Sequence, residues 1–265
     1  MPLTGYSDVR AVRCVGRSVD IAMRHRDSGD HLVIFLHGLA CGKESFDGAF
    51  DSPLLARFSL CAIDFPGHGE SPRDPAGRSG LRSYAEIVAA VIDQLSPGTV
   101  SIVGHSMGGS VGLVACEIIG PPITYVSIEG NLTGADCGLI SRGIAEQSNT
   151  EFLGAGLRAL LDRLSQSTAR DLRTWGRWCA RCDPQTIHSS ARSLVEWSDS
   201  GKLVALLHTL PRVGFVYGTE SLTPDRQMCD VLAGAEIRPI PGSGHFPMID
   251  APSRLYRTLA QLLRG

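Results

Sequence analysis

A serine between glycines is the residue of this sequence best suited to act as a nucleophile. Residues 104–108 read G-H-S-M-G, which matches the pattern G-x-S-x-G around Ser106. An apolar run at 99–103 precedes the motif, and an apolar stretch with helical spacing follows it at 110–119. A sharp strand-to-helix turn of this kind raises the serine hydroxyl clear of the sheet and directs helix N–H groups toward an oxyanion. The pattern therefore predicts a nucleophile at Ser106, with a purely structural glycine-rich turn as the alternative.

Short apolar runs alternate with helical patterns on both sides of this motif. Strands are expected at 32–36, 58–63, 99–103, 123–128, 213–217 and 237–240, and helices at 84–95, 110–119, 226–232 and 252–263. Such alternation predicts an α/β fold with a mostly parallel, doubly wound sheet covered on both faces. Between the fourth and fifth of these strands the pattern is helical only. We therefore expect a core domain made of residues 1–131 and 211–265, with a helical cap inserted at 132–210.

Four motifs occur in an order that resembles the α/β-hydrolase superfamily. They are His37-Gly38, the pattern D-x-P-G-x-G-x-S at 64–71, the motif around Ser106, and Gly244-His245 near the C-terminus. The resemblance covers nearly the whole chain. It implies the α/β-hydrolase fold and a hydrolytic reaction that proceeds through a serine.

The resemblance also implies a base and an oxyanion hole. A serine hydroxyl needs a neighbouring base to take its proton. In this superfamily the loop before the last helix carries the catalytic histidine, and His245 occupies that loop. The implied oxyanion donors are the backbone N–H groups of Leu39, after the first buried strand, and of Met107, directly after the nucleophile. His105 adjoins the nucleophile, but its side chain is expected to point away from it.

The third member of the triad departs from the commonest pattern of the superfamily. That pattern has an Asp three residues after a Gly, and this sequence has Ser221 there. Relatives such as the haloalkane dehalogenases carry the acid at the end of the strand after the nucleophile helix, where this sequence has Glu129. A buried carboxylate needs a partner, which His245 would supply. Glu129 is the favoured acid, Glu220 and Asp225 are alternatives, and backbone N–H groups alone could also satisfy Glu129.

All three tryptophans, Trp175, Trp178 and Trp197, fall within the expected cap. We expect Trp175 and Trp178 to contact a substrate, with packing of the cap onto the core as the alternative. Arginines at 170, 173, 177 and 181 follow helical spacing. They would either attract an anionic acyl group or, as we favour, form a solvated helix face.

Composition narrows the classes of function. The chain has 265 residues, 43% of them hydrophobic, and a net charge of −2, which gives no field for binding nucleic acid or an anionic membrane. No apolar run is long enough to span a bilayer, and the N-terminus lacks a signal-peptide pattern. Eight scattered cysteines are then expected to be reduced thiols of a cytoplasmic protein. Neither a metal nor an organic cofactor is expected.

These features favour a carboxylesterase-like enzyme that acts on a small-molecule acyl substrate through a Ser-His-Glu triad and an acyl-enzyme. Hydrolysis of C–C, amide or thioester bonds would use the same groups, and a perhydrolase would replace water with peroxide. A different class also stays open, namely a ligand receptor or partner-binding protein that retains the triad. The sequence determines neither the acyl chain, nor the leaving group, nor the oligomeric state.

Overall fold

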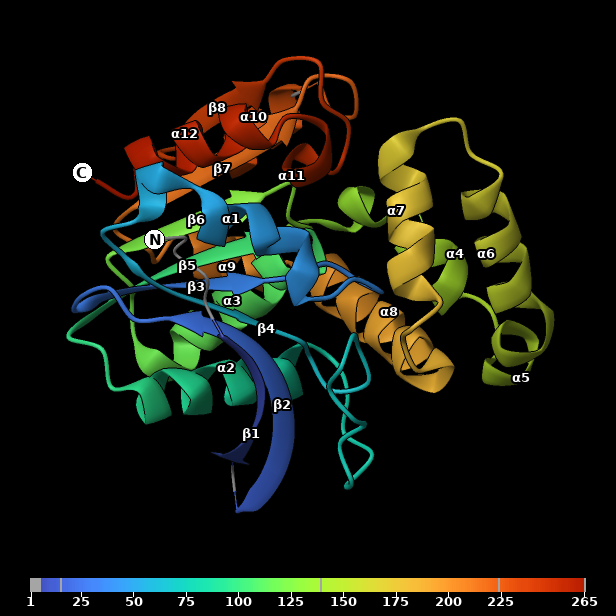
Figure 1. Ribbon diagram of the computed structural model, residues 1–265. Helices are drawn as coiled ribbons and strands as arrows, with labels where there is room; N and C mark the ends of the chain where they lie inside the picture. The colour runs from blue at the N-terminus through green and yellow to red at the C-terminus, as the bar shows by residue number, and fades with distance from the viewer. Residues whose placement is uncertain (1–5, 15, 139, 224, 265) are drawn as a thin grey trace.

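The computed structural model describes residues 6–14, 16–138, 140–223 and 225–264 (Figure 1). Within them, eight strands form one sheet in the order β1-β2-β4-β3-β5-β6-β7-β8. The strands are β1 (Tyr6–Cys14), β2 (Arg17–Arg26), β3 (His31–Leu36), β4 (Ser59–Ile63), β5 (Thr99–His105), β6 (Thr124–Ile128), β7 (Val213–Gly218) and β8 (Glu236–Ile240). Pairing is parallel from β4 through β8, which confirms the expected α/β class with a mostly parallel sheet.

The sheet begins with an antiparallel hairpin that the sequence analysis did not predict. β1 pairs with β2, with Val12 opposite Val19, and β2 continues antiparallel to β4. Val12, Val19 and Ile21 are fully or almost fully buried. Polar residues such as Asp20 separate these apolar positions, so the hairpin has the alternating pattern of a half-buried sheet edge rather than a continuous apolar run.

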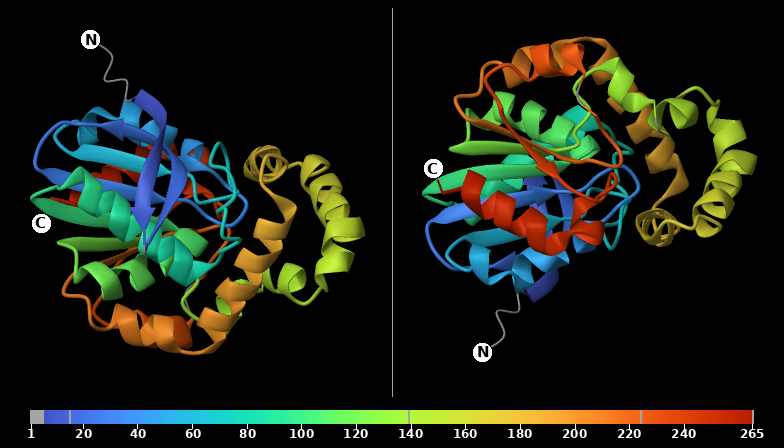
Figure 2. Two further views of the ribbon diagram at one scale, coloured as in Figure 1. Left: turned by 90° about the horizontal axis from the view of Figure 1, so that it is seen from below. Right: turned by 90° about the horizontal axis from the view of Figure 1, so that it is seen from above.

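Helices cover both faces of the sheet (Figure 2). The helices outside the region between β6 and β7 are α1 (Asp47–Asp51), α2 (Leu81–Leu95), α3 (Met107–Ile119), α10 (Arg226–Val231), α11 (Pro247–Asp250) and α12 (Pro252–Leu262). α2 packs against α3 on one face, and α1 packs against α12 on the other. In α2, the buried residues Tyr84, Val88 and Val91 recur at helical spacing, so one stripe of the helix faces the core.

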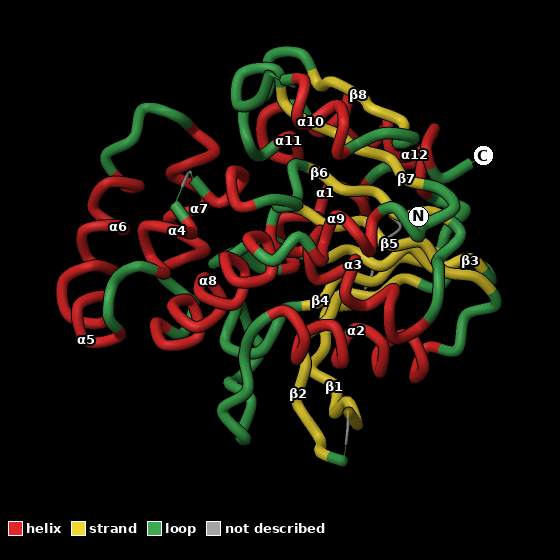
Figure 3. The backbone as a smooth tube through the Cα atoms, turned by 180° about the vertical axis from the view of Figure 1, so that it is seen from behind, coloured by secondary structure: helices red, strands yellow, loops and turns green. Residues whose placement is uncertain are grey.

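A helical segment lies between β6 and β7. It contains α4 (Ser141–Ala145), α5 (Asn149–Glu151), α6 (Leu157–Ser165), α7 (Arg170–Cys179), α8 (Pro184–Asp199) and α9 (Lys202–Leu207). In the same segment, a 3-10 helix, Gly134–Cys137, precedes α4, and a π-helical stretch, Phe152–Gly156, precedes α6. Two other 3-10 helices, Lys43–Phe46 and Pro53–Leu55, lie between β3 and β4. α4 to α8 project from one end of the sheet, whereas α9 packs against α3 (Figures 1 and 3).

None of the helices in the described ranges combines the length and the hydropathy that a membrane span requires.

Candidate active site

Ser106 stands at a tight turn between β5 and α3. Its backbone has φ 51° and ψ −123°, a strained conformation for a residue with a side chain. The flanking glycines are required by packing. A Cβ at Gly104 would lie 2.4 Å from the carbonyl oxygen of Gly108, and a Cβ at Gly108 would lie 2.1 Å from that of Leu36. Close approach of strand and helix therefore produces the turn that exposes Ser106.

Glu129 lies directly after β6, at the carboxyl edge of the sheet, and contacts His245. Its Oε2 lies 2.6 Å from His245 Nδ1. Its Oε1 accepts hydrogen bonds from the Gly218 N–H, at 2.7 Å, and from Ser221 Oγ, at 2.5 Å. The Glu129 side chain is only 6% exposed, and these donors compensate the carboxylate for burial. A carboxylate at Nδ1 keeps the proton on that nitrogen, so Nε2 of neutral His245 is an acceptor.

The alternative acids lie elsewhere. The Asp225 carboxylate accepts a hydrogen bond from the Met228 N–H at 2.8 Å and so caps α10. Glu220 lines the same cavity as His245, but it is exposed and has no recorded contact with the imidazole in the described part of the chain. The structure therefore brings Glu129, rather than Glu220 or Asp225, to His245.

The Ser106 hydroxyl faces Asn131. Ser106 Oγ donates to Asn131 Oδ1 at 3.3 Å, and among the described residues it has no hydrogen bond to His245. Asn131 Nδ2 donates to the Asp136 carbonyl oxygen at 2.7 Å, which orients the amide with its oxygen toward the serine. The sequence analysis did not identify Asn131, because no motif marks it. The sequence feature that could have indicated Asn131 is its position two residues after Glu129, at the same edge of the sheet.

His105 connects the Ser106 turn to the loop that carries His245. His105 Nε2 lies 2.8 Å from the backbone carbonyl oxygen of His245. Burial, with a smaller effect of His245, lowers the pKa of His105 well below its usual value. A neutral His105 that donates from Nε2 therefore holds the main chain of His245 in place.

The loop after β3 lies against the Ser106 turn. A Cβ at Gly38 would lie 3.2 Å from Ser106 Cβ. In the described ranges, no acceptor is recorded for the backbone N–H of Leu39 or of Met107, the two expected oxyanion donors. The carbonyl of Leu39 accepts a hydrogen bond of 3.0 Å from Trp175 Nε1, so α7 is attached to this loop.

His37 supports the same loop from below. Its Nδ1 lies 2.8 Å from the Gly38 carbonyl oxygen, and its Nε2 accepts a hydrogen bond from the Phe65 N–H at 3.0 Å. Burial lowers the pKa of His37 to about 4. His37 is therefore neutral at physiological pH and joins the loop after β3 to the loop after β4.

Ser106, Glu129 and His245 line one cavity of about 620 Å³. Trp175 and Phe246 form part of its wall. Trp178, which we expected at the substrate, is not among the lining residues, and its ring centroid lies 6.3 Å from that of Phe246. Trp197 also lies outside the lining and packs beneath Lys202 Nζ, 5.6 Å from the ring centroid. The structure thus brings Trp175, alone of the three tryptophans, to the cavity.

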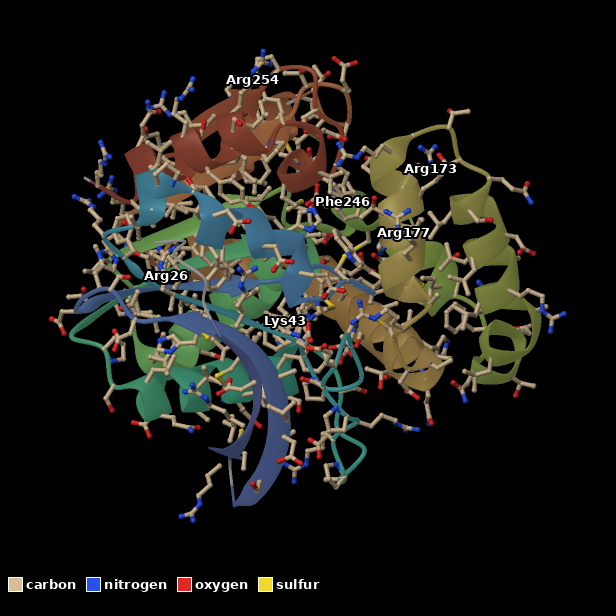
Figure 4. The ribbon with its side chains drawn as sticks, viewed as in Figure 1. Arg26, Lys43, Arg173, Arg177, Phe246 and Arg254 are labelled. Carbon is tan, nitrogen blue, oxygen red and sulfur yellow. The ribbon has the colours of Figure 1, made fainter. Side chains whose placement is uncertain are left out.

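The arginines of α7 are not among the residues that line the cavity. Figure 4 labels two of them, Arg173 and Arg177. Arg173 donates to the carbonyl oxygens of Ser167 and Thr168, each at 2.7 Å. Arg177 donates to Thr174 Oγ1 at 2.9 Å. These side chains are therefore engaged on the outer part of the helical segment. Among the described residues, no group of three or more His, Cys, Asp and Glu side chains could hold a metal ion.

Comparison with known proteins places the chain in a family. The sequence profile of the Alpha/beta hydrolase family matches residues 33–258. A protein of Mycoplasma pneumoniae, whose name describes it as an esterase or lipase, is 35% identical over 89 residues, which are 34% of this chain and 33% of that protein. The dihydrolipoyllysine-residue acetyltransferase component of the acetoin cleaving system of Cupriavidus necator is 26% identical over 230 residues, covering 77% of this chain and 59% of that one.

The chain thus spans between a third and three fifths of the length of these two relatives. Among solved structures, a thermophilic esterase from Thermogutta terrifontis superposes with a TM-score of 0.77 at 18% identity, covering 98% of each chain. At that identity the superposition shows the fold alone. The family profile covers most of the sequence, including the turn at Ser106 and the His245 loop, and the chain therefore belongs to the alpha/beta hydrolase family.

Proposed function

We propose that this chain is a serine esterase that cleaves a carboxylic ester, or a related acyl bond, of a small molecule. The observation that carries the proposal is the 2.6 Å contact between His245 Nδ1 and Glu129 Oε2 in the cavity that also exposes Ser106. Backbone strain at Ser106 and a paired imidazole at one cavity are what a serine nucleophile requires. The names of the Mycoplasma pneumoniae relative and of the Thermogutta terrifontis esterase support the same class of reaction.

The proposed reaction begins with a rotation of the Ser106 hydroxyl from Asn131 toward His245 Nε2. Oγ then attacks the carbonyl carbon while Nε2 takes its proton, and Glu129 stabilises the imidazolium that forms. The N–H groups of Leu39 and Met107 stabilise the tetrahedral oxyanion. The imidazolium protonates the leaving alcohol, which leaves an acyl-enzyme. A water that loses its proton to His245 then releases the acid and restores Ser106.

We further propose that α4 to α8 act as a cap over this site. Ile140, Leu172 and Trp175 line the cavity from this segment, opposite residues of the sheet edge. The hydrogen bond from Trp175 to Leu39 attaches the segment to the loop that would stabilise the oxyanion. In this arrangement the cap would define the volume available to the acyl or alcohol group.

A fluorophosphonate probe, combined with p-nitrophenyl acetate and butyrate, tests the function. We expect stoichiometric labelling of Ser106, many turnovers per chain, and loss of both in Ser106→Ala. Ser165→Ala, which changes an exposed serine of α6, is the matched control and should keep both. Labelling with less than one turnover per chain would refute the enzyme and indicate a triad-retaining receptor.

A further inference from the structure

The wall of the cavity is acidic. Among its described lining residues are four carboxylates, those of Glu129, Asp136, Asp171 and Glu220, and no lysine or arginine. Glu129 is engaged with His245. Asp136 Oδ2 accepts hydrogen bonds from two backbone N–H groups and a threonine hydroxyl at 132–133. The two other acids of the wall are Asp171, with one hydrogen bond from the Leu172 N–H, and Glu220, for whose carboxylate no hydrogen bond is recorded among the described residues.

Asp171 combines burial with a free oxygen. The residue is 8% exposed and lies in the first turn of α7. Its Oδ1 accepts a hydrogen bond from the Leu172 N–H at 2.8 Å, whereas no hydrogen bond or ion pair of Oδ2 is recorded among the described residues. A first-turn carboxylate is favoured by the helix dipole, but that effect does not satisfy an oxygen at a cavity wall.

A second carboxylate lies close to Asp171. A Cβ built on Gly244 would be 3.2 Å from Asp171 Oδ2 and 3.4 Å from Asp250 Oδ2. The two carboxylates therefore meet at the residue that precedes His245. Burial raises the pKa of Asp250, and the charge of Asp171 adds to this rise. The Gly244 N–H, which donates to Asp250 Oδ2 at 2.9 Å, and the charge of Arg170 act in the opposite direction without cancelling it. A cation between the two would relieve this repulsion.

Aromatic rings accompany these charges. Trp175, Phe215 and Phe246 line the same cavity, and the faces of aromatic rings attract ammonium groups. Arg173 and Arg177 of α7 bind carbonyl and hydroxyl groups away from the cavity. The charge of Arg170 acts on Asp250, but Arg170 is not among the residues that line the cavity. Negative charge and aromatic faces in one cavity are the combination that recognises a quaternary or primary ammonium ion.

We infer that Asp171, with Asp250 beside it, is the specificity-determining group of the cavity, and that the preferred ester carries an ammonium group. The statement about an ester rests on the proposed function, whereas the affinity for an ammonium ion does not. An anionic ester is disfavoured by the same carboxylates.

Binding is tested without turnover in the Ser106→Ala variant. Calorimetry compares choline with 3,3-dimethylbutan-1-ol, which has the same shape without the charge. We expect choline to bind about tenfold more tightly at low salt, which is the effect of one charge pair near a protein surface. Adding Asp171→Asn should reduce this preference to about twofold or less. Asp162→Asn, which removes one exposed acid of α6, is the control for net charge and should keep it.

Turnover is tested in the unmodified chain with acetylcholine and 3,3-dimethylbutyl acetate in a pH-stat. We expect the ratio of their kcat/KM values to be about ten and to fall toward one in Asp171→Asn. The ratio cancels any general loss of activity in the variant. Choline preference without hydrolysis of either ester would overturn the proposed function and support the acidic cavity. Hydrolysis of both esters at equal kcat/KM, with equal affinity for the two alcohols, would overturn the inference and leave the esterase intact.

Discussion

Replacement of Glu129 by glutamine is the perturbation whose result the structure defines most closely. The main-chain N–H of Gly218 can only donate, and it lies 2.7 Å from Glu129 Oε1. The glutamine oxygen must therefore take the Oε1 position, which directs its NH₂ group at His245 Nδ1. Nδ1 then has to accept, so the imidazole proton moves to Nε2. In that tautomer Nε2 has no lone pair with which to take the Ser106 proton.

The expected loss in kcat follows from this reversal. In a serine triad, the wrong tautomer of the histidine and the loss of the carboxylate charge together lower kcat by about 10⁴-fold. This corresponds to about 5.5 kcal/mol of transition-state stabilisation. Glu129→Gln should reach a loss of about this size, with a far smaller change in KM. Circular dichroism and thermal unfolding would establish that the variant is folded.

The assay is p-nitrophenyl butyrate hydrolysis with active-site titration by fluorophosphonate. Glu220→Gln, an isosteric change at the exposed acid of the same cavity, is the matched control and should stay within about twofold. A Glu129→Gln variant that keeps kcat within tenfold of the unmodified chain would refute the tautomer argument. A comparable loss of kcat in Glu220→Gln instead would identify Glu220 as the acid of the triad.

Three further outcomes are expected from the surroundings of the site. Trp175→Phe removes the hydrogen bond to the Leu39 carbonyl, so the loop that would stabilise the oxyanion loses one restraint. This variant should lower kcat about tenfold with little change in KM. Equal changes in kcat and KM would contradict this expectation. Asn131→Ala removes the acceptor of the Ser106 hydroxyl and should raise the rate constant of fluorophosphonate labelling by up to about fivefold, the value of one long neutral hydrogen bond; a slower reaction would assign Asn131 a supporting role. Burial lowers the pKa of His68 to about 3, so the unfolded chain takes up a proton below pH 6.5 that the folded chain refuses. The free energy of unfolding should therefore decrease as the pH is lowered, by about 2 kcal/mol from this histidine between pH 7.5 and pH 5 in urea titrations. His68→Asn should remove that part of the pH dependence. An unchanged pH dependence in the variant would contradict a neutral His68 in the folded chain.

The parallel part of the fold could be predicted because its central strands, such as β3 and β4, are short runs of mostly apolar, buried residues. The turn at Ser106 could be located because its glycines are needed at fixed spacing for packing: a Cβ at Gly108 would lie 2.1 Å from the Leu36 carbonyl oxygen. The β1–β2 hairpin was missed because only alternate residues, such as Val19 and Ile21, face the core. Alternation in a chain rich in polar residues is a weaker signal than a continuous run.

Contacts from a side chain to a backbone carbonyl distant in sequence were the part that the sequence could not provide. Trp175 and Leu39 are 136 positions apart, and His105 and His245 are 140 apart. No sequence motif marks either contact, because both depend on how the loops and the helical segment are placed in space. Trp178 shows the same limit in reverse. It is as aromatic as Trp175 and only three positions away, yet the orientation of α7 leaves it outside the cavity wall.

The indole of Trp175 also limits how this chain can be recombined with its relatives. Exchange of the segment between β6 and β7 is an obvious way to build chimaeras with new substrate ranges. Here such a graft would also delete the indole N–H that donates to the Leu39 carbonyl and leave only the weak donor Cys41 Sγ, so a foreign segment would have to bring its own donor to that position. Chimaeras designed to retain an indole there should outperform those chosen for segment length alone.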